Sequence, residues 1–249
     1  MSLLEVLRRL ESGRVVTHQV TIPEGFTALD IAQLLASERL ADPVRFMALV
    51  GDPALATRLG LPGPTLEGYL FPDTYRLSRG MGEEEILQIM AARFRQVVPA
   101  DIEARAERLQ LDIRGVITLA SLIEKEAKQD RERPIIAGVF LNRLRLSMPL
   151  QSDPTAVYGA PDPRRRVTPL DLQRKTPYNT YQNPGLPPGP IANPGLSSIL
   201  AVLSPARVSY LYFVAKNDGT HFFSRTLDEH THAVRLYQVK DRSPESSGS

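Results

Sequence analysis

The distribution of proline is the sequence feature that most constrains how this chain can fold. Of its 21 prolines, twelve lie between Pro149 and Pro205. Proline fixes φ and lacks a backbone N–H donor, so it interrupts helices and is excluded from central strands. We therefore expect that stretch to be poor in regular structure, with helices and strands concentrated on either side of it.

A short β-rich segment followed by helices is expected before the proline-rich stretch. "VVTHQVTI" (15–22) is rich in β-branched residues and predicts a strand that ends at the turn "PEG". Thr27 is expected to cap a helix over Ala28–Ser37. Residues 61–78 are expected to be irregular. Apolar periodicity predicts further helices over residues 3–10, 43–50, 82–97, 101–109, 113–128 and 133–146.

The last part of the chain predicts a hairpin and a helix. "SYLYFVAK" and "HFFSRT" flank the turn sequence "NDGT" and predict two antiparallel strands. Residues 227–239 predict a final helix, and residues 242–249 predict a disordered tail. The expected fold class is α+β, with a small module over residues 1–60 and a helix-rich domain over residues 61–241.

Composition excludes several classes of function. The net charge of +2 is small and the basic residues are dispersed, which argues against a protein that binds nucleic acid. The chain has no cysteine, and its four histidines form no metal-binding motif, so neither a metal site nor a cofactor is expected. No apolar run reaches the ~18 residues that a membrane span requires.

The helix expected around "ASLIEKEA" (120–127) places a carboxylate in its apolar stripe. At 100° per residue, Glu124 lies about 40° from Ala120, whereas Glu126 lies about 120° away on the other flank. Burial raises the pKa of a carboxyl group, and this is one way in which a glutamate becomes a general acid. An ion pair between Glu124 and Arg133 or Arg143 of a neighbouring helix is the alternative interpretation.

Residues 176–206 contain no charged side chain. The segment offers tyrosine, asparagine and glutamine side chains between rigid Pro and Gly turns. Neutral hydrogen-bonding groups beside aromatic rings suit a sugar, which presents hydroxyl groups at its edge and C–H groups on its faces. The alternative is a proline-rich connector without a binding role.

Several motifs occur in an order that resembles a known family. They are "LEGYLFPDTY", "ASLIEKEA", "VFLNRLRLSMPLQSDPTAVYG", "TPYNTY", "GLPPGPIANPG" and "YLYFVAKNDGTHFFSRT". Together they resemble the endolytic murein transglycosylases, the MltG or YceG-like family, over roughly residues 3–240. The resemblance implies a LysM-like module followed by a lytic transglycosylase domain.

The resemblance also implies a reaction and a set of site residues. The β-1,4 bond between N-acetylmuramic acid and N-acetylglucosamine is cleaved within a glycan strand, which leaves a 1,6-anhydro end and terminates strand elongation. Glu124 is expected to protonate the leaving oxygen and then to accept the proton of the C6 hydroxyl group. The residues expected to bind substrate are Asn142, Gln151, Ser152, Asp153, Tyr158, Tyr178, Asn179, Tyr181 and Asn193.

The implied partners are peptidoglycan glycan strands and the machinery that polymerises them. The implied location is the periplasmic side of a bacterial inner membrane, with an anchor helix missing from this chain. Two other functions stay open. One is a muramidase-type hydrolase that uses Asp153 or Asp73 as a second carboxylate. The other is a non-enzymatic peptidoglycan-binding module in which Glu124 is structural.

Overall fold

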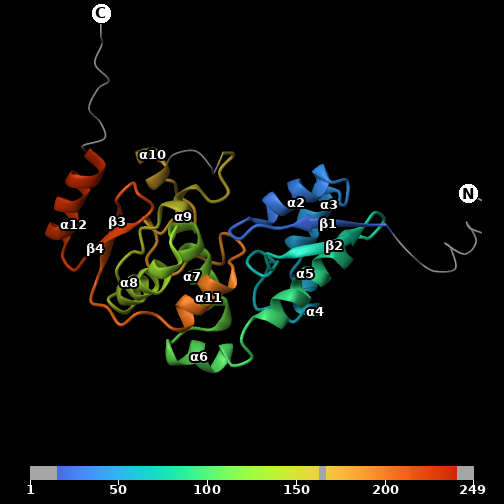
Figure 1. Ribbon diagram of the computed structural model, residues 1–249, viewed down its shortest axis with the longest axis horizontal. Coiled ribbons are helices and arrows are strands. Elements are labelled where there is room, and N and C mark those ends of the chain that lie inside the picture. Colours follow the sequence, from blue (N-terminus) through green and yellow to red (C-terminus); the bar gives the residue numbers. More distant parts are fainter. Residues whose placement is uncertain (1–15, 163–166, 240–249) are drawn as a thin grey trace, which may run out of the picture.

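The computed structural model describes residues 16–162 and 167–239 and has an α+β fold of two lobes (Figure 1). The expected helix over residues 3–10 and the expected tail over residues 242–249 lie outside these ranges. The N-terminal lobe contains β1 (Thr17–Thr21), α2 (Ala28–Ser37), α3 (Pro43–Val50), α4 (Pro53–Arg58), β2 (Thr74–Ser78) and α5 (Glu83–Val97). Its predicted strand and its helices α2, α3 and α5 are confirmed.

The sheet of the N-terminal lobe joins segments far apart in sequence. β1 and β2 are antiparallel, with Thr17 opposite Ser78. The prediction that residues 61–78 are irregular is therefore wrong at β2, where alternation turns Tyr75 and Leu77 into the core. Because β2 follows residue 60, the sheet crosses the domain boundary expected from the sequence.

The second lobe is mostly helical (Figure 1). It contains α6 (Ile102–Arg108), α7 (Ile113–Glu126), the 3₁₀ turn η1 (Asp130–Glu132), α8 (Arg133–Arg145), α9 (Asp153–Val157), α10 (Pro169–Leu172), α11 (Leu196–Leu203), β3 (Tyr212–Ala215), β4 (His221–Ser224), α12 (Leu227–Val234) and the π-helical turn η2 (Arg235–Val239). The predicted hairpin is confirmed, with Tyr212 opposite Ser224.

Helix α7 forms the centre of the second lobe, since all residues from Gly115 to Ile123 are buried. It packs against α8 and α11. The uncharged helix α11 was not predicted, because it lies in the proline-rich stretch. Pro194 and Pro205 flank it without entering it, so the helix forms between them.

The turn after β1 is fixed to the second lobe. The backbone N–H of Gly25 donates to the carbonyl of Asn193 at 2.9 Å, and the N–H of Asn193 donates to the carbonyl of Phe26 at 2.9 Å. Gly25 has a φ of 75°, which favours glycine. In the described ranges, no helix is long and apolar enough to cross a membrane.

Candidate active site

Glu124 lies at the junction of the two lobes and is surrounded by hydrogen-bond donors. Its Oε1 atom is 3.1 Å from the guanidinium of Arg133. Its Oε2 atom accepts from the backbone N–H of Gly195 at 3.0 Å and from the hydroxyl of Ser198 at 2.8 Å. Both oxygens thus accept hydrogen bonds. This arrangement fits the ion pair with Arg133 that was the alternative interpretation of the sequence.

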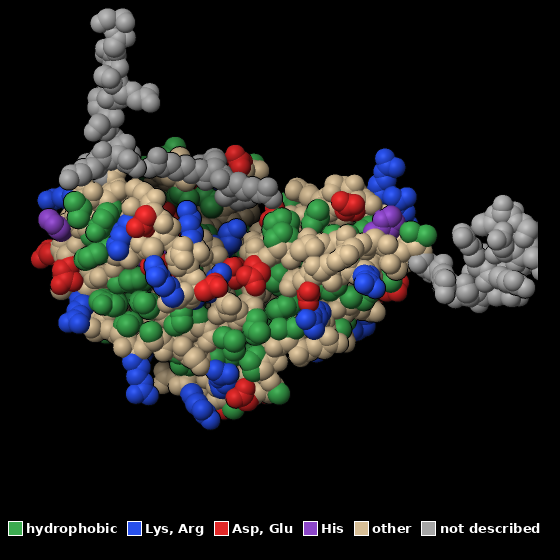
Figure 2. Space-filling model, in the orientation of Figure 1, with side chains coloured by type: hydrophobic (Ala, Val, Ile, Leu, Met, Phe, Trp, Pro, Cys, Tyr) green, Lys and Arg blue, Asp and Glu red, His purple; other side chains and the backbone are tan. Residues whose placement is uncertain are grey.

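Arg133 connects several side chains at this junction. Its guanidinium also donates to Asp130 at 2.9 Å and to Ser198 at 2.5 Å. Glu24, in the turn after β1, places its carboxylate where a Cβ atom at position 195 would lie, so only glycine fits there. Desolvation, followed by the charge of Glu124, raises the pKa of Glu24. Figure 2 shows acidic and basic side chains gathered where the lobes meet.

Glu126, at the end of α7, lies in a different environment. Its Oε1 atom accepts from the hydroxyl of Ser152 at 2.6 Å. Burial is the main cause that raises its pKa to about 7, and the nearby charge of Asp153 acts in the same direction. Its side chain is partly accessible from a cavity of about 270 Å³. Glu126 is therefore a carboxyl group that can hold a proton near neutral pH and reach a ligand.

The wall of this cavity, which we call the Glu126 cavity, comes from several parts of the second lobe. They are the end of α7, α8 with the loop before α9, the start of α9, the loop after α10, the hairpin, and the C-terminal helices. Its lining residues are Glu126, Arg143, Leu150, Gln151, Asp153, Tyr181, Phe213, Val214, Ala215, His221, His230, Val234 and Gln238.

Four of the residues predicted to bind substrate gather at the Glu126 cavity. Gln151, Asp153 and Tyr181 line it, and the buried Ser152 holds Glu126 from behind. The hydroxyl of Tyr181 donates to Asp153 at 2.6 Å. The structure thus brings these residues together around Glu126 and not around Glu124.

Tyr158 and Tyr178 lie close to each other beside a buried carboxyl group. Their ring centroids are 4.7 Å apart, and the hydroxyl of Tyr158 donates to Glu67 at 3.1 Å. Glu67 also accepts from the backbone N–H of Ala28 and from the amide of Asn193. Burial raises the pKa of Glu67 to about 7. Its donors come from both lobes, so Glu67 helps to hold them together.

Asn179 and Asn193 are fully buried and have structural partners. The side-chain oxygen of Asn193 accepts from the N–H groups of Gly68 and Leu70, both at 2.9 Å. The side-chain nitrogen of Asn179 donates to three backbone carbonyl groups, the closest of which is that of Arg174 at 2.8 Å. These contacts favour a role in shaping the loops over direct contact with a ligand.

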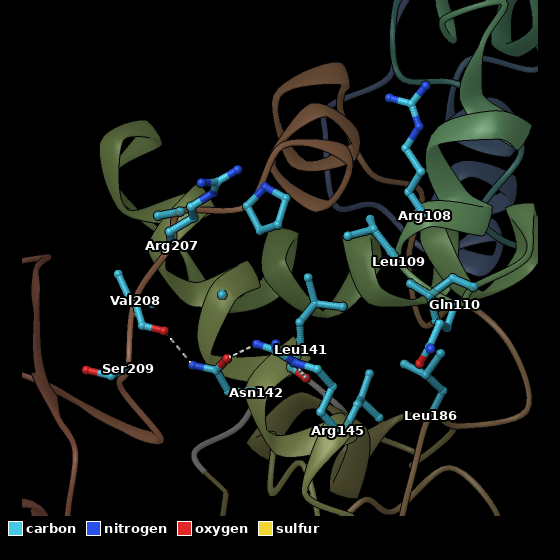
Figure 3. Close-up of a pocket in the computed structure, with 15 residues that line it drawn as sticks. Arg108, Leu109, Gln110, Leu141, Asn142, Arg145, Leu186, Arg207, Val208 and Ser209 are labelled. Atoms are coloured by element: carbon cyan, nitrogen blue, oxygen red, sulfur yellow. Dashed lines mark hydrogen bonds between the residues drawn. The ribbon is translucent and has the colours of Figure 1, made fainter.

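Asn142 lines a separate cavity of about 1030 Å³ (Figure 3). Its amide nitrogen donates to the carbonyl groups of Val208 and Tyr210, each at 2.9 Å. Arg108, Arg145 and Arg207 also line this cavity, and its lining includes no carboxylate. This cavity offers no general acid, so the smaller Glu126 cavity is the better candidate for catalysis.

Several residues of interest were not identified from the sequence. Glu67 lies inside the motif "LEGYLFPDTY" and carried no periodicity that set it apart. His221, in the second strand of the hairpin, also carried no pattern that set it apart. Asp73, expected as a second carboxylate, is 2.6 Å from Arg93 and does not line the Glu126 cavity.

The fold and site define a class: a two-lobed α+β protein with a carboxyl group of raised pKa in a polar cavity, as in enzymes that use acid catalysis. In the described residues, no group of three His, Asp or Glu side chains is placed to hold a metal ion. Residues 1–236 match the model of the YceG-like family, so the chain belongs to that family.

Proteins similar to this chain carry a shared name. One from Bacillus subtilis (strain 168), named endolytic murein transglycosylase, is 37% identical over 95% of this chain and 70% of its own length. One of the same name from Streptococcus pneumoniae serotype 2 is 30% identical over 94% of this chain and 48% of its own length. The family predicted from the sequence is confirmed.

The fold is similar to that of a solved structure. The crystal structure of a yceG-like protein from Listeria monocytogenes has a TM-score of 0.78 and 33% sequence identity. The similarity covers 93% of this chain and 81% of that one. The predicted α+β class is confirmed at this level.

Proposed function

We propose that this protein is an endolytic murein transglycosylase and that Glu126, in place of Glu124, is its general acid. The observation that carries the assignment of the acid is the position of Glu126 in a cavity wall, with a pKa raised to about 7. A general acid works best when its pKa lies near the working pH. Family membership and the shared name of the relatives support the reaction class.

The reaction needs one proton donor and no positioned water. Glu126 protonates the glycosidic oxygen between N-acetylmuramic acid and N-acetylglucosamine while the bond to C1 breaks. The C6 hydroxyl of the same muramyl residue gives up its proton to a base and attacks C1, and this intramolecular attack has a high effective concentration. Ser152 orients the carboxyl group of Glu126, and Tyr181 orients Asp153.

We assign the N-terminal lobe to a LysM-like module and the second lobe to the catalytic domain. Glycan-polymerising machinery as a partner and a periplasm-facing membrane location stay predictions. The polar lining and the aromatic ring of Tyr181 support a sugar ligand in the Glu126 cavity, because sugars combine hydroxyl edges with apolar faces.

A muramidase-type hydrolase is the second candidate function, because Asp153 could act as a second carboxylate beside Glu126. Hydrolysis by two carboxylates adds water to the new end, whereas transglycosylation does not. Digestion of purified glycan strands in water enriched in heavy oxygen separates the two reactions by mass spectrometry. We expect anhydro ends without the label, and labelled reducing ends would overturn the proposal.

Glu126→Gln serves as the matched control in this digestion, because the amide retains the shape of the side chain but cannot act as the acid. We expect this variant to form products about a thousandfold more slowly than the wild type. Binding of glycan without cleavage by the wild-type protein would favour the non-enzymatic peptidoglycan-binding module.

A further inference from the structure

The side chain of His221, the first residue of β4, is held in one orientation by Glu132. Its Nδ1 atom is 2.7 Å from Oε2 of Glu132, and its backbone N–H donates to Oε1 of the same carboxylate at 3.1 Å. Each of the two side chains is only 8% exposed. The ring of Phe213 packs edge-on against the imidazole, with the two ring centroids 5.4 Å apart. These contacts fix the plane of the imidazole.

The pairing also determines which imidazole nitrogen can accept a proton. An ionised carboxylate only accepts hydrogen bonds, so Nδ1 of His221 carries the hydrogen and Nε2 of the neutral ring has a lone pair. Among the described residues, none makes a hydrogen bond to this Nε2 atom. His221 lines the Glu126 cavity, so an imidazole oriented by a carboxylate shares one cavity with the carboxyl group of Glu126.

The other titratable groups of the cavity come from each element around it. They are Glu126 on α7, Arg143 on α8, Asp153 on α9, Tyr181 in the loop after α10, and His230 on α12. His230 is the less suitable base, because its Nδ1 atom is buried without a hydrogen-bond partner and no carboxylate orients the ring. His230 stacks instead on Tyr212, with ring centroids 5.2 Å apart.

We propose that His221 is the base that takes the proton of the muramyl C6 hydroxyl while Glu126 protonates the glycosidic oxygen. This proposal rests on the proposed function. The bond between C1 and the glycosidic oxygen breaks, and a bond between C1 and O6 forms. One proton leaves Glu126 and one arrives at Nε2 of His221. Transfer of that proton back to Glu126 through solvent restores both groups, and no water is consumed.

Glu132 has a positioning role in this scheme. Its carboxylate keeps Nε2 free of hydrogen and stabilises the imidazolium that forms after proton transfer, as a carboxylate does for a catalytic histidine elsewhere. The backbone contact to His221 ties the same carboxylate to the hairpin. A purely structural pair would tie the hairpin to η1 without affecting how the rate depends on pH.

The test compares His221→Gln with wild type on purified glycan strands, with kcat, KM and the pH profile measured per folded molecule. We expect kcat to fall about a hundredfold, the contribution typical of general base catalysis, with KM within about threefold. The wild-type rate falls on the acid side as the base becomes protonated, and this acid limb is absent from His221→Gln. Melting curves give the folded fraction.

Two further variants keep the proposal falsifiable if His221→Gln folds poorly. Glu132→Gln removes the carboxylate that stabilises imidazolium, so we expect about a tenfold loss in kcat and an acid limb displaced to lower pH. His232→Gln, at an exposed histidine on α12, is the matched control and retains the wild-type profile.

Wild-type kcat and an unchanged acid limb in folded His221→Gln would overturn the assignment of the base. The assignment would also be overturned if the acid limb of the pH profile survives in His221→Gln and disappears in His230→Gln. Retained activity in Glu126→Gln is a different failure, because it removes the acid of the proposed function while the result for His221 stands separately.

Discussion

Glu124 and Glu126 are two positions apart on α7, yet they lie in opposite environments. Glu124 meets donors from Arg133, Gly195 and Ser198 at the lobe junction. Glu126 meets one hydroxyl, that of Ser152, and lines a cavity. A carboxyl group that accepts on both oxygens stabilises the fold, whereas one that faces a cavity with a raised pKa can transfer a proton. Burial alone does not distinguish these roles.

The largest difference between the two glutamates is expected in activity. Glu126→Gln should lower the rate of glycan cleavage by about a thousandfold, because the general acid is lost. Glu124→Gln should retain activity within about threefold per folded molecule. Product formation measured by mass spectrometry, together with the folded fraction, checks both. An inactive, folded Glu124→Gln beside an active Glu126→Gln would restore the expectation from the sequence.

Stability should show the reverse order. Glu124→Gln leaves the buried guanidinium of Arg133 without its buried ionic partner, which should cost about 3 kcal/mol of unfolding free energy. The matched control is Glu84→Gln, at the exposed ion pair with Arg58, which should cost less than about 1 kcal/mol. Urea unfolding measures both. Equal losses would mean that the junction ion pair is no more important than a surface one.

The pH dependence of stability sharpens the comparison at Glu126. Its pKa is raised to about 7 in the folded protein from an ordinary value of 4.5, so folding favours the protonated form. The wild type should therefore match Glu126→Gln below pH about 4.5 and lose about 2 kcal/mol relative to it as the pH rises to about 7. This loss of stability is smaller than the full change in the pKa of Glu126 implies, because the side chain faces a cavity that water can enter. Parallel stability curves would exclude a raised pKa.

The smallest effect is expected at the hydroxyl of Tyr181. Tyr181→Phe removes the hydrogen bond to Asp153, worth about 1 kcal/mol, and should lower kcat/KM about fivefold. Tyr178→Phe is the control and should stay within about twofold, since its ring packs on Tyr158 outside the Glu126 cavity. Equal losses in the two variants would remove Tyr181 from the site.

Much of the fold could be predicted from local patterns. The helix over Ala28–Ser37 was found with its capping residue Thr27, because a capping box is a local signal. The hairpin of β3 and β4 was found because its turn and strands are adjacent in sequence. β2 was missed because its partner β1 lies more than fifty residues away.

The sequence by itself determined the family, the α+β class and the motif that contains both glutamates. The helical period also indicated correctly that Glu124 faces the protein interior. Tertiary structure alone decided what lies opposite each carboxyl group. Glu124 is contacted from other elements by Arg133, Gly195 and Ser198. Glu126 is contacted by Ser152 from a distant loop, and its cavity is also lined by His221 from the hairpin. A carboxyl group's proton affinity depends on the charges, donors and solvent around it, and these are set by folding and not by neighbours in sequence.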